Sequence, residues 1–159
     1  MDIYEFAMQM EQDGEQFYRN LADKCGNQGI ARILTGLAND EAKHYRIVRD
    51  MAENAGADME ATTILTDAKN VFEQMQGTSF DLGGLQVDVY RQAQEIERRS
   101  REFYEEKADQ VTRPGTKAVL LEIAEEERRH FFLLDQIIEF MNRPETWIEN
   151  AEFNHLEAY

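Results

Sequence analysis

Two short segments repeat the same pairing of a glutamate with a histidine three residues later. The pairs are Glu41 and His44 in DEAKH, and Glu127 and His130 in EEERRH. Residues three apart on a helix lie on one face, so each pair can bind one metal ion together. The apolar residues around both pairs recur at helical spacing and place the pairs on the face that a helix normally buries. A metal ion would explain why a carboxylate and an imidazole lie there.

Two further glutamates occupy matching positions on other helical segments. Glu11 lies in an apolar stripe with Tyr18, and Glu97 lies in a similar stripe with Tyr104. Four uncompensated carboxylates inside a helical bundle would be costly or would take up protons. Two divalent cations would balance their charge, and two neutral histidines would add nitrogen ligands. The predicted metal ligands are Glu11, Glu41, His44, Glu97, Glu127 and His130.

This ligand set indicates two metal ions in a four-helix bundle. One glutamate from each of two helices, with Glu-x-x-His from each of the other two, is the ligand pattern of dimetal carboxylate bundles. A mixed oxygen and imidazole set suits iron or manganese, and zinc is an alternative. The other interpretation is a metal-free helical scaffold in which these groups pair with Arg or Lys. No Lys or Arg occupies the same stripes near the glutamates, which weakens that interpretation.

Helical periodicity extends over four long segments, about 2–24, 28–54, 86–110 and 114–142. Glycines near residue 26 and the Arg113-Pro114-Gly115 sequence separate the members of each pair, as expected for short turns between antiparallel helices. In the long segment between the pairs, Thr66 is predicted to cap a short helix that ends near Met75.

The chain contains an internal duplication. When the sequence is shifted by 86 residues against itself, twelve positions between residues 4 and 44 meet an identical residue, including all the predicted glutamate and histidine ligands. Two copies of one helical hairpin can bury their apolar faces against each other as a four-helix bundle. The crossover 55–85 is long enough to run the length of the bundle, so the second and third long helices are expected to be parallel.

The predicted fold is therefore all-α, a ferritin-like antiparallel four-helix bundle of two duplicated hairpins joined by a long crossover. The bundle is expected to occupy residues 1–142, with repeats at about 2–54 and 86–142. Residues 143–159 are expected to form a short helix that docks on the bundle or on a partner subunit, and His155 within them is expected to be an ordinary surface residue.

The composition excludes several classes of partner. A formal charge of −15 and a pI near 4.5 argue against nucleic acid and anionic membranes, both of which need a basic face. No apolar run approaches the length of a membrane span, and the N-terminal residues do not resemble a signal peptide. The single cysteine, Cys25, cannot form an internal disulfide. A cytoplasmic protein is expected.

Four segments carry a resemblance to a known family: MEQDGEQFY at 10–18, DEAKHYRIV at 40–48, IERRSREFY at 96–104 and EEERRHFFLL at 125–134. Over about 1–142 the chain resembles rubrerythrin-type members of the ferritin-like di-iron superfamily. The resemblance implies that Glu41 and Glu127 bridge two irons. It also implies that Glu11 and Glu97 are terminal ligands, and that His44 and His130 each complete one iron.

The resemblance also implies a function. It suggests a non-haem di-iron oxidoreductase that reduces hydrogen peroxide or dioxygen in defence against oxidative stress. A homodimer or higher homo-oligomer is also expected, because a long crossover is the kind of segment that two subunits can exchange. The rubredoxin domain of full-length rubrerythrins does not follow the bundle, so a separate rubredoxin-like protein is expected to donate the electrons. The alternative is ferritin-like oxidation and storage of ferrous iron.

Two features of the chain modify this expectation. Peroxide-reducing rubrerythrins usually carry a seventh glutamate ligand at the position of Ser100, whose repeat mate is Gly14. Small residues at both positions leave room for an oxidant beside the metals. Tyr18 and Tyr104 lie two turns beyond Glu11 and Glu97, where they can hydrogen-bond a ligand carboxylate, carry an oxidising equivalent, or fill the core.

Overall fold

The computed structural model describes residues 2–53, 62–74 and 87–142, which form five α-helices and no strand. The four long helices are α1 (Ile3–Lys24), α2 (Gln28–Ala52), α4 (Val87–Gln110) and α5 (Pro114–Asn142), and α3 (Ile64–Gln74) is shorter. The bounds of the four long helices agree with the predicted segments to within about two residues. The proposed tail helix and His155 lie outside the described residues.

Local chemistry explains where the first hairpin's helices begin. The Asp2 side chain accepts a hydrogen bond from the backbone N–H of Glu5, and Asn27 accepts one from Ile30. Each bond satisfies a donor that has no partner inside the helix. Pro114 is the first residue of α5, where its missing N–H removes no helical hydrogen bond.

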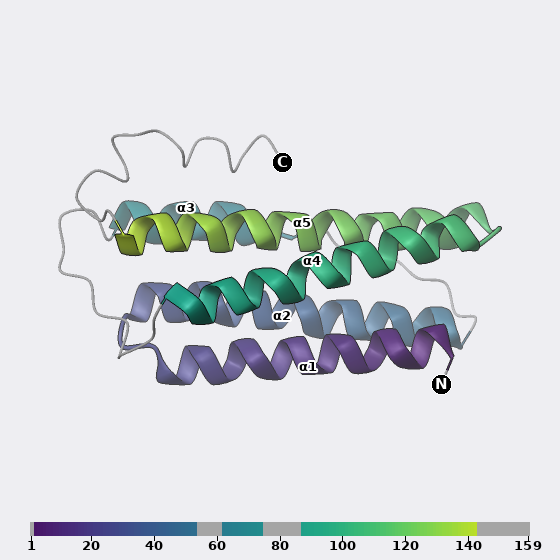
Figure 1. Cartoon of the computed structure of the whole chain (residues 1–159), viewed down its shortest axis with the longest axis horizontal. Coiled ribbons are helices and arrows are strands. Elements are labelled where there is room, and N and C mark those ends of the chain that lie inside the picture. Colours follow the sequence, from purple (N-terminus) through teal and green to yellow (C-terminus); the bar gives the residue numbers. More distant parts are fainter. Residues whose placement is uncertain (1, 54–61, 75–86, 143–159) are drawn as a thin grey trace.

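The two hairpins pack side by side with the helix directions that the long crossover predicted (Figure 1). Within each hairpin the helices are antiparallel, and α2 and α4 run in the same direction. Side-chain contacts agree with this arrangement. Tyr18 of α1 bonds Glu97 of α4, whereas Tyr104, further along α4, bonds Glu11, nearer the start of α1. These crossed contacts require α1 and α4 to be antiparallel, and they confirm the all-α, ferritin-like four-helix bundle.

The short helix α3 begins before the predicted position. It starts at Ile64, so Thr66 lies inside the helix and the prediction that it caps the N-terminus is wrong. The hydroxyl of Thr62 accepts the backbone N–H of Ile64 instead. The Ile64 side chain is buried against α2, and this tertiary contact fixes where the helix begins.

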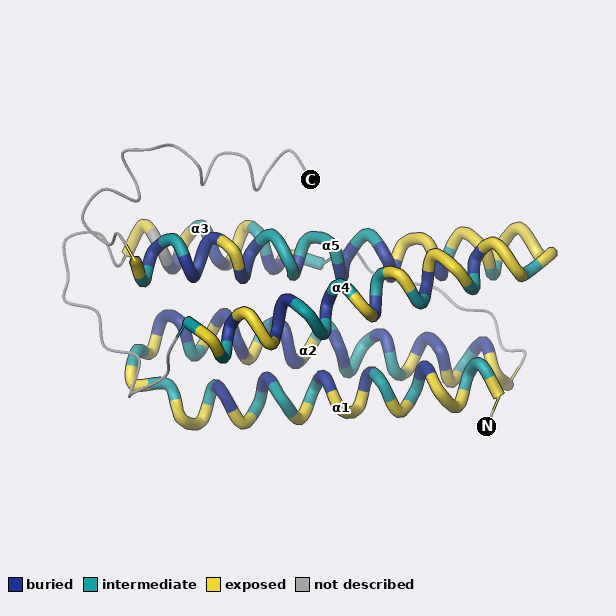
Figure 2. Tube along the Cα trace, in the orientation of Figure 1, coloured by how far each residue is buried: buried dark blue, intermediate teal, exposed yellow. Residues whose placement is uncertain are grey.

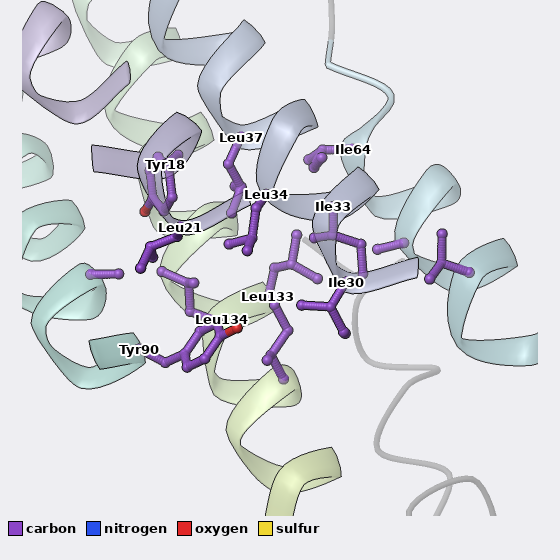
Figure 3. Close-up of a cluster of buried hydrophobic side chains, with 14 of the residues drawn as sticks. Tyr18, Leu21, Ile30, Ile33, Leu34, Leu37, Ile64, Tyr90, Leu133 and Leu134 are labelled. Carbon is purple, nitrogen blue, oxygen red and sulfur yellow. The ribbon is translucent and has the colours of Figure 1, made fainter. Parts of the chain in front are cut away.

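Each long helix buries one side and exposes the other (Figure 2), and the buried sides form two apolar clusters. The larger cluster includes Leu34, Leu37, Leu133 and Leu134 together with residues of α3 (Figure 3). The smaller cluster includes Ile47, Val48, Leu120 and Ile123. The duplication exchanges the two clusters, because a shift of 86 residues relates Leu34 to Leu120 and Ile47 to Leu133.

Within the described ranges, no helix is both long enough and apolar enough to cross a membrane.

Candidate metal centre

The structure brings all six predicted ligands together inside the bundle. Their exposed fractions are 0–3 %. They form two groups in which the candidate ligand atoms lie within 4.8 Å of one another: Glu11, Glu41, His44 and Glu127 in one, and Glu41, Glu97, Glu127 and His130 in the other. Glu41 and Glu127 belong to both groups, which is the position expected of carboxylates that bridge two ions.

The bundle positions these side chains through its duplicated helices. Each of α1, α2, α4 and α5 carries one of the four glutamates near the middle of its length, on the buried face. The pairs His44–Glu126 and Tyr18–Glu97 are repeated as His130–Asp40 and Tyr104–Glu11 after the shift of 86 residues. The centre therefore has approximate two-fold symmetry, and one hairpin repeats the contacts of the other.

Each histidine is oriented by a carboxylate of the opposite hairpin. His44 Nε2 lies 2.8 Å from Glu126 Oε1, and His130 Nε2 lies 2.8 Å from Asp40 Oδ2. The other ring nitrogen, Nδ1, then faces the glutamates: His44 Nδ1 is 3.0 Å from Glu127 Oε1, and His130 Nδ1 is 3.3 Å from Glu41 Oε1. A carboxylate that holds one nitrogen of a metal-binding histidine is a common supporting arrangement. The free ligand atom of both histidines is Nδ1.

Asp40 and Glu126 were not identified as site residues from the sequence. A signal was present, because each immediately precedes the glutamate of a Glu-x-x-His pair and the two are repeat mates. Lys43 connects them: its Nζ lies 2.9 Å from Glu126 Oε1 and 4.0 Å from Asp40 Oδ1. The hydroxyl of Thr62 also donates to Asp40 Oδ2 at 2.6 Å, so the crossover contributes to the support of His130.

The two buried tyrosines hold the glutamates of α1 and α4. Tyr104 Oη donates to Glu11 Oε1 at 2.7 Å, and Tyr18 Oη donates to Glu97 Oε1. In each glutamate this leaves Oε2 as the oxygen without a partner. Of the roles that the sequence left open, the structure shows hydrogen bonding to the candidate ligands, and both tyrosines also pack in the core clusters.

The unpartnered buried atoms provide a test of whether metal ions fit. Among the described residues, each of the six predicted ligands has at least one buried side-chain atom without a hydrogen-bond partner: Glu11 Oε2, Glu41 Oε1, His44 Nδ1, Glu97 Oε2, both oxygens of Glu127, and His130 Nδ1. Buried polar atoms normally have partners, so this concentration in one place needs a ligand. Metal bonds of about 2.0–2.2 Å separate neighbouring ligand atoms by about 3 Å. Here the Nδ1 atoms of the two histidines lie 3.0–3.8 Å from the nearby glutamate oxygens, so small movements would bring them to that spacing. The donor set fits two divalent cations.

Burial and mutual repulsion strongly perturb the ionisation of the bridging candidates. Burial raises the pKa of Glu41 well above its usual value, and the charges of Glu11 and Glu127 raise it further. Burial and the charges of Glu97 and Glu11 also raise the pKa of Glu127. Without metal, burial and repulsion therefore favour the protonated form of these carboxyl groups, and cations would favour the charged form.

The pKa values of the two histidines are raised although burial alone would lower them. Burial alone would lower the pKa of His44, but the charge of Glu11 and the hydrogen bond with Glu126 raise it to about 10. The pKa of His130 is also raised well above its usual value, since the charge of Glu97 and the Asp40 contact outweigh burial. Burial would raise the pKa of Asp40, but the contact with His130 lowers it to about 2. Metal binding at neutral pH must therefore release protons from both rings.

A groove between α1 and α4 lies close to the candidate centre. Its volume is about 580 Å³, and both Gly14 and Ser100 line it. A Cβ atom on Gly14 would lie 2.9 Å from Glu41 Oε2, so glycine allows α1 to approach this carboxylate closely. Ser100, at the position of the family's seventh glutamate, is buried on the facing helix.

Comparison with known proteins agrees with the geometry of this site. The family model described as Rubrerythrin matches residues 2–138. The chain belongs to the rubrerythrin family. Neither the curated proteins nor the solved structures contained a match to the chain. Membership of the rubrerythrin family and the buried Glu/His groups together support a ferritin-like di-iron protein.

Proposed function

We propose that this chain is a non-haem di-iron oxidoreductase that reduces hydrogen peroxide or dioxygen. The observation that carries the proposal is the pair of overlapping Glu/His groups whose buried ligand atoms have no other partner. Glu11 and His44 would hold one iron, Glu97 and His130 the other, and Glu41 and Glu127 would bridge them. The same ligands also suit manganese or zinc, which are the alternative metals at this site.

Peroxide needs two electrons and two protons to become two water molecules, and a pair of ferrous ions bound here would supply the electrons. The protein's own residues prepare the site for this reaction. Tyr18 and Tyr104 fix the glutamates of α1 and α4, while Asp40 and Glu126 fix the imidazole rings. The two apolar clusters exclude water from both ends of the centre.

The remaining parts of the proposal concern access and electron supply. The small residues Gly14 and Ser100 line a groove near Glu41, and a small oxidant would approach the centre from this groove. The electrons would come from a separate donor such as a rubredoxin-like protein, and the reaction would protect the cell against oxidative stress.

Two observations argue against a metal-free scaffold. Within the described residues, the four buried glutamates form no ion pair with Arg or Lys, and Lys43 pairs with the outer carboxylates Asp40 and Glu126 instead. In the same part of the chain, both oxygens of Glu127 lack a hydrogen bond. Without metal, the cluster must hold protons on buried histidines and leave buried oxygens without hydrogen bonds, and each such oxygen costs about 1–3 kcal/mol.

The first test is iron content. Protein from iron-supplemented cells should contain about two irons per chain, and the double variant Glu41→Ala/Glu127→Ala should contain almost none. The control is Glu122→Ala, which removes an exposed carboxylate of α5 and should leave the iron content unchanged. Less than half an iron per chain in the wild type, unaffected by the double substitution, would leave a duplicated bundle without this chemistry.

Reoxidation rates then identify the reaction. The reduced protein should be reoxidised rapidly by hydrogen peroxide or by dioxygen, and a rubredoxin-like donor should then sustain turnover. If the protein instead takes up and retains many more than two irons per chain while it consumes the oxidant, the ferritin-like storage function is correct.

A further inference from the structure

The groove between α1 and α4 is built from repeat mates. Its walls include Met10 and Phe17 of α1 and Ile96 and Phe103 of α4, and Gly14 and Ser100 lie between them. A shift of 86 residues relates Met10 to Ile96, Gly14 to Ser100, and Phe17 to Phe103. The groove therefore follows the same approximate two-fold relationship as the candidate metal centre beneath it.

The size and lining of the groove suit a small organic molecule. Its volume of about 580 Å³ falls within the range of about 300–1,000 Å³ that is common for small-molecule sites. The groove has aromatic walls at both sides and extends to Phe6, which is 50 % exposed and whose ring centroid lies 5.1 Å from that of Phe103. An exposed phenylalanine in contact with a groove wall offers an additional apolar surface to a flat ring.

The charged residues at the rim restrict what can enter. Three acidic residues line the groove, Asp13, Glu102 and Glu106, against one basic residue, Arg99. Arg99 Nε is 3.1 Å from Glu95 Oε1, so an acidic neighbour already engages its charge. Glu102 is likewise paired, with Arg98 Nη1 at 2.7 Å from its Oε1, and Lys107 Nζ lies 5.6 Å from the ring centroid of Phe103. The residues that line the groove still carry a net negative charge, because Asp13 and Glu106 remain, and this charge disfavours anions. It also disfavours a second copy of the chain, because a symmetric dimer would bring two such rims together.

The groove and the candidate centre share one neighbour, Gly14. This residue lines the groove, and a Cβ on it would lie 2.9 Å from Oε2 of Glu41. A molecule in the groove would thus lie one residue away from a carboxylate that belongs to both candidate metal groups.

We propose that this groove binds a small aromatic molecule without negative charge, close to the candidate metal centre. This inference goes beyond reduction of an oxidant, because it assigns a site for an organic ligand beside the centre. Binding itself does not require metal, whereas any part played by the ligand in the chemistry rests on the proposed function.

Two fluorescent probes with the same ring system test the proposal. N-phenyl-1-naphthylamine is uncharged, and 8-anilino-1-naphthalenesulfonate adds a negative charge. With protein as purified, and again after chelation of metals, the uncharged probe should bind saturably at one site per chain. The anionic probe should bind about tenfold more weakly because of the acidic rim. The variant Glu102→Gln/Glu106→Gln should reduce this difference.

The matched variants are Phe6→Ser and Leu121→Ser, which replace the two large apolar side chains that are exposed in the described part of the chain. Phe6→Ser should weaken binding of the uncharged probe about fivefold or more, because it removes apolar contact area. Leu121 lies outside the groove, so Leu121→Ser should not change the affinity for the uncharged probe. Equal effects of the two substitutions, or equal affinity for the two probes, would overturn the proposal.

Two further measurements test where the probe binds and whether a second copy of the chain covers the groove instead. When Mn²⁺ is bound at the centre, proton resonances of the probe should broaden, and sharp resonances with Mn²⁺ bound would place the probe elsewhere. Sedimentation should show that Phe6→Ser leaves the oligomeric state unchanged. If that substitution dissociates a dimer, the groove is an interface between copies and the proposal is wrong. The probe is also titrated into chelated protein. Absence of iron would therefore contradict only the proposed function, and absence of probe binding would contradict only the proposed groove ligand.

Discussion

At the scale of single residues, the centre is defined by which atoms already have partners. Tyr104 occupies one oxygen of Glu11, and Asp40 occupies Nε2 of His130, so Oε2 and Nδ1 remain for a metal. The same division holds in the second copy of the repeat. The supporting residues therefore determine which atom of each ligand is available to a metal, and they also hold the ligand side chain in place.

The carboxylates behind the histidines should control metal affinity. We expect Asp40→Asn and Glu126→Gln each to weaken metal binding about 10–100-fold, because an amide holds the imidazole less strongly than a charged carboxylate does. Competition with a chelator of known affinity measures this effect. Glu122→Gln, which changes an exposed carboxylate, is the control. Unchanged affinity in both variants would show that Asp40 and Glu126 do not support the site.

Gly14 should be required for the metal centre more than for the fold. In Gly14→Ala the new Cβ must displace Glu41 Oε2, so we expect a loss of metal affinity of about tenfold or more. The helix itself should tolerate alanine. Gly115→Ala is the matched control, because a Cβ at that position has no atom within 4 Å. Equal metal affinity in the two variants, measured by the same competition, would contradict this expectation.

At the scale of elements, each long helix supplies one glutamate to the candidate metal centre. The short helix α3 and Thr62, which precedes it, contact α2. Thr62 reaches Asp40, and Ile64 packs against Gly36 of α2. The periodicity of the sequence predicted the long helices well, because a buried face of 22–29 residues repeats the pattern many times. It misplaced the start of α3, because Thr62 accepts the N–H of Ile64 and the Ile64 side chain packs against α2, so the helix begins two residues before Thr66.

Docking of α3 should depend on the absence of a side chain at Gly36. In Gly36→Leu the new side chain would overlap Ile64 Cδ1, so we expect α3 to detach from α2 and the protein to lose about 1–3 kcal/mol of stability. Thermal melting and limited proteolysis within 64–74 measure the effect. Gly115→Leu provides the control for leucine at an open helical position. Similar melting temperatures and cleavage rates in the two variants would show that this contact does not hold α3.

At the scale of the whole molecule, each candidate metal group joins the two hairpins. The first group takes Glu127 from the second hairpin, and the second group takes Glu41 from the first. Metal binding should therefore stabilise the bundle as a unit. When the free concentration of one metal ion is about 100-fold above its Kd, binding of that ion adds about 2.7 kcal/mol to the free energy of unfolding.

The metal-free protein should lose stability as the pH rises. The pKa of His44 is raised from 6.5 to about 10, so its contribution is complete below pH 6.5 and disappears as the pH rises through about 10. The raised pKa values of His130, Glu41 and Glu127 act in the same direction, because the unfolded chain releases these protons first.

We therefore expect the melting temperature of chelated protein to fall between pH 7 and pH 10. Metal-loaded protein should show a smaller decrease, because the ligands are already deprotonated. Calorimetry at each pH, with and without metal, makes the comparison. A melting temperature that rises with pH in the chelated protein would contradict the assignment of the protonated groups.

The sequence alone determined the duplicated bundle and which six residues meet inside it. Helical periodicity shows which face is buried, and the shift of 86 residues shows which positions share a role. Only the tertiary structure decided which atoms of those residues are available. Glu126 reaches His44 from the opposite hairpin, and the groove at Gly14 forms only where α1 and α4 face each other. Such contacts join residues that are distant in the chain, so no local spacing in the sequence specifies them.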